Sequence, residues 1–526
     1  MDRNGSGRKQ CAGNFGATPV RAGLATSGRF AFLPLRAVEP LGWLREQLQI
    51  QASGLSGHLE EVWKDVGPDS GWLGGKGESW GRGPYYLDGY VPLAYLLDDD
   101  AMKKKAQKWI DWRLDHVQAN GMIGPASNDD WWPRIVMLRV LAQYCEATGD
   151  PRVISTMTRY CEYQLSALPG RPLQEWGKFR WQDEALAVLW LHERTGNPKL
   201  LQLARLLHQQ GYDGQKSFEH FDLTEKTDKH LLDTSAGDPR DKIRPMAAYG
   251  VNNAMGLKHS PVWYRLTGAG HDRRAFHEQL GNLDQYHGLP NGLFSADEHL
   301  AERNPSQGTE LCTVVEMMHS LEQAFAVLGD VAIADRLEKV AFNALPGTLT
   351  DDMWAHQYDQ QSNQVRCDKR ERQWSTNGPD SNVFGLEPNF GCCTANYHQG
   401  WPKLVSSMWM RTQNGGLAAA VYGPNIVRTI VSGDVPIEIE QQTNYPYSRV
   451  CDYGGPAETQ VSFRVALADP RVGARSHVVG KWQDEPGNHA RKVRNCRPRV
   501  GPRGSSGDFA SHEASYHEMV SAVRCG

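Results

Sequence analysis

Residues 291–329 read NGLFSADEHLAERNPSQGTELCTVVEMMHSLEQAFAVLG, and this stretch decides how the rest of the chain is interpreted. Apolar residues recur in its second half at Leu311, Val314, Val315, Met318, Leu321, Phe325 and Leu328. Their spacing places them on one face and predicts an amphipathic helix. Gly329 follows directly and favours the end of the helix at that point.

An acid and a thiol stand at the start of this predicted helix. Glu310 and Cys312 are two residues apart, and such residues do not face the same way on a helix. They converge only if the backbone is still extended at Glu310. A second pair, Cys392 and Cys393, follows a glycine and precedes another amphipathic run. The unpaired N–H groups of a helix start stabilise negative charge, so both places suit thiolates.

These four side chains form an O,S,S,S donor set. Zinc takes four tetrahedral ligands and favours thiolate, so the set predicts a zinc ion on Glu310, Cys312, Cys392 and Cys393. The spacing is not that of a zinc finger, and an unpaired cysteine is often a small buried apolar residue. The residues alone leave both interpretations open.

The runs GLFSADEHL, GTELCTVVEMMHSLEQAF, ADRLEKVAFNALPG, HQYDQQSNQ and FGCCTANYHQGWPKL resemble glycoside hydrolase family 127, the β-L-arabinofuranosidases. The resemblance spans residues 35–447 and is densest over residues 263–409. It implies a Zn2+ ion held by the E-x-C and C-C elements, with Cys392 as a nucleophile. It also implies that Glu298 is the general acid/base and that Tyr358 lies in the active site.

The implied chemistry is hydrolysis with retention at a non-reducing-end sugar. A glycosidase needs an acid to protonate the leaving oxygen and a second group to capture the anomeric carbon. Zinc deprotonates a coordinating thiol, which makes a Cys392 thiolate available for covalent attack. Asp297 is the alternative to Glu298 as the acid, and a solvated loop carboxylate is the other interpretation of Glu298.

The sequence departs from the family at the sugar pocket. The characterised arabinofuranosidases bind the sugar with histidines, whereas the corresponding segments here read DWWP at residues 130–133 and YGVN at residues 249–252. We therefore expect the substrate to contact Trp131, Trp132, Tyr249 and Asp183. L-arabinofuranose itself is not implied by these residues.

Glycine-containing stops at residues 149, 196, 268 and 329 end the helical stretches 135–145, 183–192, 253–264 and 311–328. Repeated helix ends without strand signals between them predict stacked helical hairpins, either an open solenoid or a closed toroid. Uneven intervals disfavour a regular solenoid, and the resemblance implies a mainly α fold, the (α/α)6 toroid of six-hairpin glycosidases. Aromatic and polar segments at residues 77–89, 128–133, 180–183 and 284–287 are expected as loops that bind an oligosaccharide or glycoside.

After Trp409 short alternating β-branched runs predict a partial antiparallel β-sandwich. The expected domains are residues 29–410 for the barrel and residues 411–465 for the sandwich. Residues 1–28 are expected to be disordered or a mis-assigned start, and residues 466–526 to be an atypical, disordered or frameshifted tail.

The overall composition excludes several classes of protein. With 57 basic and 61 acidic residues the net charge is −4, which argues against a nucleic-acid surface. No apolar run reaches the length of a membrane span, and ten cysteines in 526 residues are no disulfide scaffold. Without a recognisable signal peptide the default location is cytoplasmic, and the oligomeric state stays open. Two alternatives remain, namely a non-catalytic carbohydrate-binding or structural-zinc toroid, and a polysaccharide lyase or unsaturated glucuronyl hydrolase that does not need Cys392.

Overall fold

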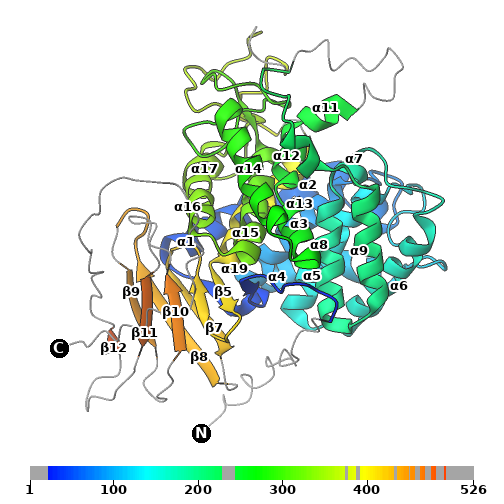
Figure 1. The fold of residues 1–526 in the computed structure, drawn as a ribbon. Coiled ribbons are helices and arrows are strands. Elements are labelled where there is room, and N and C mark those ends of the chain that lie inside the picture. The colour runs from blue at the N-terminus through cyan, green and yellow to red at the C-terminus, as the bar shows by residue number, and fades with distance from the viewer. Residues whose placement is uncertain are drawn as a thin grey trace.

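The computed structural model describes residues 22–227, 243–372, 377–386, 391–431 and 435–448, together with the backbone of four later strands. Helices dominate this part of the chain up to residue 407, and strands follow (Figure 1). The expectations for residues 1–21 and for most of the segment 466–526 fall outside the described residues.

A closed ring of helices forms the centre of the molecule. Its members in chain order are α3 (Arg82–Leu96), α5 (Trp131–Thr148), α8 (Trp181–Thr195), α12 (Gly250–Gly256) with α13 (His259–Thr267), α15 (Leu311–Leu328), and α18 (Gly391–Asn396) with α19 (Gly400–Ser407). Each packs against the next, and α18 and α19 return to α3. The predicted (α/α)6 toroid is confirmed.

A second layer of helices covers the ring from outside. It consists of α4 (Asp100–Asp115) on α3, α6 (Pro151–Ala167) on α5, α9 (Pro198–Gln210) on α8, α14 (Gly270–His287) on α13 and α16 (Val331–Lys339) on α15. Helices α1 (Gly42–Ser53) and α2 (Leu55–Val62) precede α3. Shorter helices are α7 (Glu175–Phe179), α10 (Gly214–Glu219), α11 (Ile243–Ala248) and α17 (Leu345–Gly347).

The predicted helix ends are found where the glycines stand. Helices α5, α8, α13 and α15 each stop at a glycine with positive φ, whose N–H bonds a carbonyl of the last helical turn. The single helix expected over residues 253–264 is wrong, because it is divided into α12 and α13. Pro261 lies in the first turn of α13, where its missing N–H costs nothing, whereas a continuous helix would lose a hydrogen bond there.

The ring closes where α3 meets the segment after α18. A Cβ atom on Gly89 of α3 would lie 2.2 Å from the carbonyl carbon of His398, so only glycine permits this backbone approach. The side chain of Gln51 from α1 donates to the His398 carbonyl at 2.8 Å and fixes the same seam from outside.

Two five-stranded sheets follow the barrel, in the orders β1-β5-β6-β10-β11 and β12-β9-β8-β7-β2. Their later strands are β5 (Trp409–Thr412), β6 (Leu417–Ala419), β7 (Asn425–Val431), β8 (Val435–Thr443), β9 (Cys451–Gly455), β10 (Phe463–Leu467), β11 (Ser476–Gly480) and β12 (Arg491–Lys492). All neighbours pair antiparallel except β6 with β10. The predicted β-sandwich is thus present, and β11 and β12 fall within the segment expected to be atypical.

The N-terminal part of the chain contributes to both sheets, which the sequence did not indicate. Strand β1 (Phe30–Phe32) pairs with β5, and β2 (Val38–Pro40) pairs with β7. Strands that precede the barrel in the sequence and strands that follow it therefore build the β-unit together.

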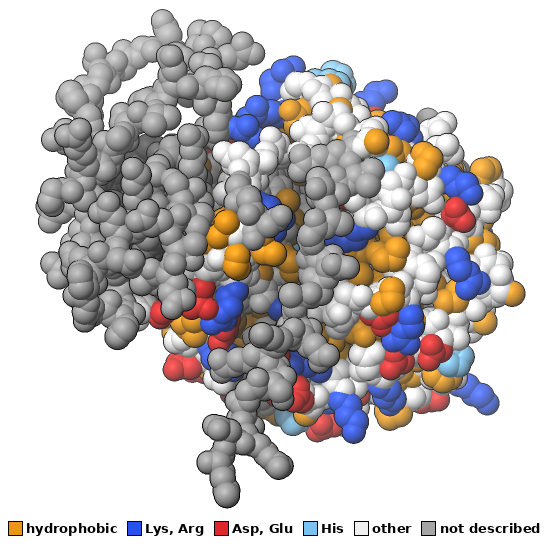
Figure 2. All heavy atoms as spheres, turned by 90° about the horizontal axis from the view of Figure 1, so that it is seen from below, with side chains coloured by type: hydrophobic (Ala, Val, Ile, Leu, Met, Phe, Trp, Pro, Cys, Tyr) orange, Lys and Arg blue, Asp and Glu red, His pale blue; other side chains and the backbone are white. Residues whose placement is uncertain are grey.

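The surface carries mixed charges. Figure 2 shows basic and acidic side chains interspersed over the described part of one face, as expected for a net charge of −4. Among the helices that the structure describes, none has the length and apolar character that crossing a membrane requires.

Candidate active site

The predicted metal ligands gather at the N-terminal ends of two inner helices. Glu310 is the N-cap of α15 and Cys312 lies in its first turn, while Cys392 and Cys393 begin α18. Tyr249, the N-cap of α12, joins them, because its hydroxyl donates to Glu310 Oε1 at 3.1 Å. The site is thus built where unpaired N–H groups of helix starts favour negative charge.

An extended backbone at Glu310 brings its side chain toward Cys312, as predicted. Glu310 belongs to β3 (Thr309–Glu310), which pairs with β4 (Asp359–Gln360), and has φ −57° and ψ 136°. The chain turns into α15 only at Leu311, whose N–H donates to the Tyr358 carbonyl at 2.8 Å. This hydrogen bond also holds the backbone of Tyr358 next to the start of α15, beside the predicted metal ligands.

The four donor atoms lie close enough together to bind one ion. One atom from each of Glu310, Cys312, Cys392 and Cys393 can be chosen so that all lie within 4.8 Å of one another. The Cys312 and Cys393 sulfurs are 3.4 Å apart, and the Cys392 and Cys393 sulfurs each lie 3.8 Å from Glu310 Oε1. Glu310 Oε2 is fully buried without a hydrogen-bond partner. An orphaned buried carboxylate oxygen beside three thiols fits a cation such as zinc.

The protonation of this cluster is uneven without an ion. Burial raises the pKa of Cys312 and of Cys393 well above the usual value of a thiol, and burial likewise raises the pKa of Glu310. Hydrogen bonds from Cys312 and Cys393 lower the pKa of Cys392. The geometry therefore favours Cys392 as the thiolate of the group.

Glu298 lies beside the cluster in a strained backbone conformation. Its φ is 127°, a region that residues with a Cβ rarely adopt, and its carbonyl accepts from the Gly250 N–H at 2.8 Å. Burial raises the pKa of Glu298, and the neighbouring negative charges of Cys392 and Asp297 raise it further. A carboxyl that keeps its proton is suited to act as a general acid.

Asp297 and Tyr358, the two other residues predicted near the reaction centre, are both buried. Asp297 is fully enclosed, and its charge helps to raise the pKa of Asp359, after the larger effect of burial. Burial raises the pKa of Tyr358, and the neighbouring Glu310 carboxylate raises it further. The Tyr358 phenol therefore stays protonated and can donate a hydrogen bond.

The tryptophans expected to bind substrate differ in position. Trp132 lies on the site side, with its ring centroid 5.8 Å from that of Tyr85. Trp131 packs away from the cysteines, against Tyr160 and Tyr163, and the Arg171 guanidinium lies 3.7 Å from its ring. Of this pair, the structure brings only Trp132 toward Tyr249.

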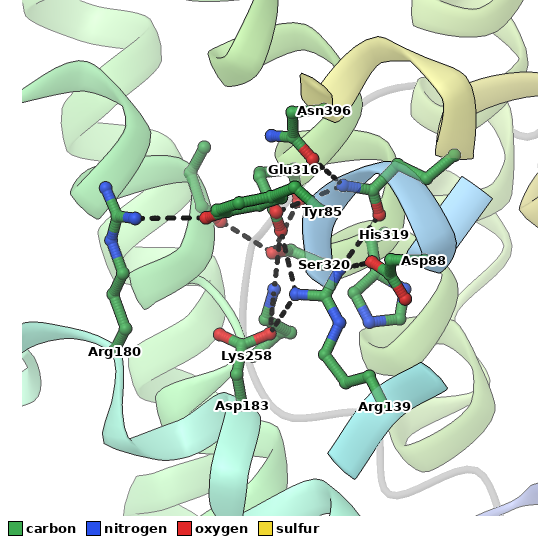
Figure 3. A network of polar contacts seen from close by, with 12 residues as sticks. Tyr85, Asp88, Arg139, Arg180, Asp183, Lys258, Glu316, His319, Ser320 and Asn396 are labelled. Carbon is green, nitrogen blue, oxygen red and sulfur yellow. Dashed lines mark hydrogen bonds and ion pairs between the residues drawn. The ribbon is translucent and has the colours of Figure 1, made fainter. Parts of the chain in front are cut away.

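Asp183 belongs to a set of buried charges (Figure 3), one of which, Glu316, lies four residues after Cys312 on α15. Each inner position of the barrel supplies one member, with alternating sign in chain order: Asp88, Arg139, Asp183, Lys258, Glu316 and Lys403. Arg139 contacts Asp88 and Asp183, and Lys258 Nζ lies 2.9 Å from Asp183 Oδ1. Three cations thus balance three carboxylates beneath the site, and we call this set the ion ring.

Four further residues lie at this end of the barrel, namely Arg82, Tyr85, Trp176 and Arg180. The sequence placed Arg82, Tyr85 and Arg180 in segments expected to bind carbohydrate without singling them out, and it did not indicate Trp176. Segments 77–89 and 180–183 were expected to be loops, but Arg82 begins α3 and Trp181 begins α8. Inner helices are buried all round, so no polar face reveals their period. The available signal was the position of Tyr85 and Arg180 beside helix starts, the same signal that located the cysteines.

Comparison with known families decides the class of enzyme. The sequence pattern described as "Beta-L-arabinofuranosidase, GH127 catalytic domain" matches residues 61–406, more than half of the chain. The chain belongs to glycoside hydrolase family 127. This family 127 member is a glycoside hydrolase, and its substrate is a carbohydrate. A search of curated protein sequences finds no match.

Solved structures of glycoside hydrolases, two of them named as family 127 enzymes, share the fold. A structure titled "Glycoside hydrolase" is 12% identical, covers 88% of this chain and 78% of its own, and has a TM-score of 0.67. The family 127 β-L-arabinofuranosidase from Geobacillus stearothermophilus T6 is 16% identical, with coverage of 85% and 80% and a TM-score of 0.64. A further family 127 β-arabinofuranosidase is 16% identical, with coverage of 85% and 72% and a TM-score of 0.61.

Proposed function

We propose that this family 127 enzyme removes a non-reducing-end sugar with retention of configuration, with Cys392 as nucleophile and Glu298 as acid/base. The observation that carries the proposal is the convergence of Glu310 and three cysteines within 4.8 Å, with the half-buried Glu298 beside them. A β-L-arabinofuranoside is the first substrate to test, because the matching family is described by that activity.

The first half of the reaction forms a bond between Cys392 and the sugar. The Cys392 sulfur attacks the anomeric carbon, and the bond from that carbon to the leaving oxygen breaks. Glu298 gives its proton to the leaving oxygen, for which its raised pKa prepares it. The product on the enzyme is a thioglycoside.

Water completes the turnover. The Glu298 carboxylate takes a proton from water while the water oxygen bonds the anomeric carbon and the carbon–sulfur bond breaks. Two displacements at one carbon retain its configuration. Tyr358 and Tyr249 keep protonated phenols beside Glu310, where they can donate hydrogen bonds to the sugar or to Glu310.

Glu310, Cys312, Cys392 and Cys393 would hold a zinc ion. Bound zinc keeps coordinating thiols deprotonated at neutral pH. Cys393 and Cys312 are the more enclosed thiols and serve as structural ligands, whereas Cys392 is partly exposed and can meet a sugar. We further assign Trp132, Tyr249, Trp131 and Asp183 to the substrate site. Trp132 and Tyr249 line it directly. Trp131 supports it through its packing, and Asp183 supports it through the ion ring.

Selective alkylation tests the nucleophile. Iodoacetamide, or a haloacetamide sugar mimic, is expected to label Cys392 before Cys393 and to abolish turnover, as read by peptide mass spectrometry. Cys367 is exposed and would also react, so the experiment uses a Cys367→Ser background. Label on Cys393 alone, or full activity after Cys392 is modified, would return the cysteines to a structural role.

A further inference from the structure

We infer that Arg180 is an anion-binding residue of the active site and that the substrate carries a carboxylate, as a uronic acid or other carboxylated sugar does. The inference rests on the proposed function, since it names the class of substrate for the same site. It starts from a buried guanidinium that has no acidic partner among the residues that the structure describes.

Aromatic rings hold the Arg180 guanidinium in place. Its Cζ atom lies 4.5 Å from the Trp132 ring centroid and 4.4 Å from that of Trp176, and the Tyr249 ring lies at 6.0 Å. Such contacts are favourable to a cation and fix the plane of the guanidinium. The side chain is therefore preorganised without using its charge in an ion pair.

In the described part of the chain, the groups that accept hydrogen bonds from Arg180 are both neutral. Nε donates to Asn252 Oδ1 at 2.8 Å. Nη1 donates to the Tyr85 hydroxyl at 3.1 Å, as Figure 3 shows. Within the described ranges no carboxylate pairs with it, and Nη2 has no hydrogen bond. Yet Arg180 is only 5% exposed. A buried guanidinium with a free N–H edge lacks a counter-charge, and a carboxylate matches that edge.

The contrast with Arg139 shows that this is not the usual state of buried arginine in the barrel. Arg139 contacts Asp88, Asp183 and Glu316 in the ion ring. Its unpartnered Nε is fully enclosed, whereas Arg180 Nη2 is not among the enclosed unpartnered atoms. The free edge of Arg180 thus remains open to a ligand.

The Tyr249 side chain connects Arg180 to Glu310 and Cys392 of the proposed active site. Tyr249 lies against the guanidinium and donates its hydroxyl to Glu310 Oε1, which is 3.8 Å from the Cys392 sulfur. An anionic substituent bound at Arg180 therefore belongs to the sugar at the cysteine site or to the residue next to it.

A pair of matched substrates tests the inference. 4-Nitrophenyl β-L-arabinofuranoside carries a C5 hydroxymethyl group, and its C5-oxidised analogue carries a carboxylate in the same place. The wild-type enzyme is expected to prefer the carboxylate in kcat/KM, and Arg180→Met is expected to reduce that preference about 10- to 100-fold, mainly through KM. Arg180→Lys keeps the positive charge but loses the paired N–H donors of the guanidinium. Its preference for the carboxylate should lie between those of the wild type and Arg180→Met.

The matched control is Arg171→Met. Arg171 also stacks on a tryptophan, Trp131, but it pairs with Asp129 at 3.0 Å and is half-exposed. This variant should keep the substrate preference. A wild-type preference for the neutral glycoside, or an equal loss on both substrates in Arg180→Met and Arg180→Lys, would overturn the inference.

Calorimetry with the free C5-carboxylated sugar separates this inference from the proposed hydrolysis. If neither glycoside is turned over, the proposed function fails, but binding to the wild type and not to Arg180→Met still supports the anion site. Acetate and inorganic phosphate serve as comparison ligands. Equal binding of these ions, or no binding of the carboxylated sugar, would overturn the site as a sugar subsite.

Discussion

Lys403 Nζ lies 2.7 Å from Asp88 Oδ2, although 315 residues separate the two in the chain. This contact joins the last inner helix to the first and closes the ion ring. Gln399 reinforces the junction, since its Oε1 accepts from Lys403 at 2.7 Å and its Nε2 donates to Glu316 Oε1 at 3.1 Å. The barrel is thus closed by balanced charge as well as by apolar packing.

Removal of one charge from the ion ring is expected to destabilise the protein strongly. Burial lowers the pKa of Lys403 to about 8, so the residue is still protonated at pH 7. Lys403→Met leaves an uncompensated buried carboxylate and should cost about 3–5 kcal/mol of unfolding free energy, measured by urea denaturation. Lys199→Met is the control, because its pair with Glu162 is exposed and should be worth under about 1 kcal/mol. Equal small losses would show that the ion ring does not hold the barrel closed.

Stability is expected to fall between acidic and mildly alkaline pH because of Glu184. This residue is fully buried, and burial raises its pKa to about 8. The folded protein keeps a proton that the unfolded chain releases near the usual value of 4.5, so the contribution is present below that pH and is lost as pH rises toward 8. The slope is at most about 1.4 kcal/mol per pH unit. Denaturation at several pH values should show that the unfolding free energy of Glu184→Gln depends less on pH than that of the wild type. Glu162→Gln, a change at an exposed residue, is the control and should keep the wild-type pH dependence. An unchanged pH dependence in Glu184→Gln would assign the slope to other groups.

Metal content should depend on Cys312. Elemental analysis of freshly purified protein is expected to find about one zinc ion per chain, and Cys312→Ser should lose most of it because three donors remain of four. Cys161→Ser is the matched control, since Cys161 is equally buried but lies in α6, outside the cluster. Zinc that survives Cys312→Ser, or a wild type without zinc, would contradict the assignment.

Glu298→Gln should affect substrates according to their leaving groups. Glycosides with poor leaving groups need protonation, so their hydrolysis is expected to fall about 10²- to 10⁴-fold, while activated aryl glycosides suffer less. Steady-state kinetics on the two substrate types measure the difference. Asp297→Asn is the comparison: full loss in that variant alone would move the acid role to Asp297, and equal losses on both substrate types in Glu298→Gln would exclude Glu298.

The sequence predicted the parts of the site that depend on local rules. Glycine stops predicted four helix ends, and the two-residue spacing of Glu310 and Cys312 predicted extended backbone before α15. The ion ring was not predicted, because its members come one from each inner position and share no local pattern. Asp183 was recognised only as a polar residue in an aromatic segment, and its two cationic neighbours, Arg139 and Lys258, are distant in sequence.

The β-unit shows the same limit. Alternation located β7 and β8, but β1 and β2 are three-residue strands, too short for any period to show. Their pairing with β5 and β7 is set by where the barrel places the chain ends. Long-range closure of this kind cannot be read from local pattern alone.

The closure also fixes an order of events during synthesis. At 5–20 residues per second, roughly 15–60 s pass between the translation of Asp88 and that of Lys403. Until α19 emerges, the nascent ion ring holds three carboxylates against two cations, and β1 and β2 wait for β5 and β7. The growing barrel therefore has an excess of negative charge at an open seam until the final inner helix is made, and burial of that charge is unfavourable before then. A chain truncated before α19 would thus contain nearly all of its helices and still be unable to close the ring of inner helices.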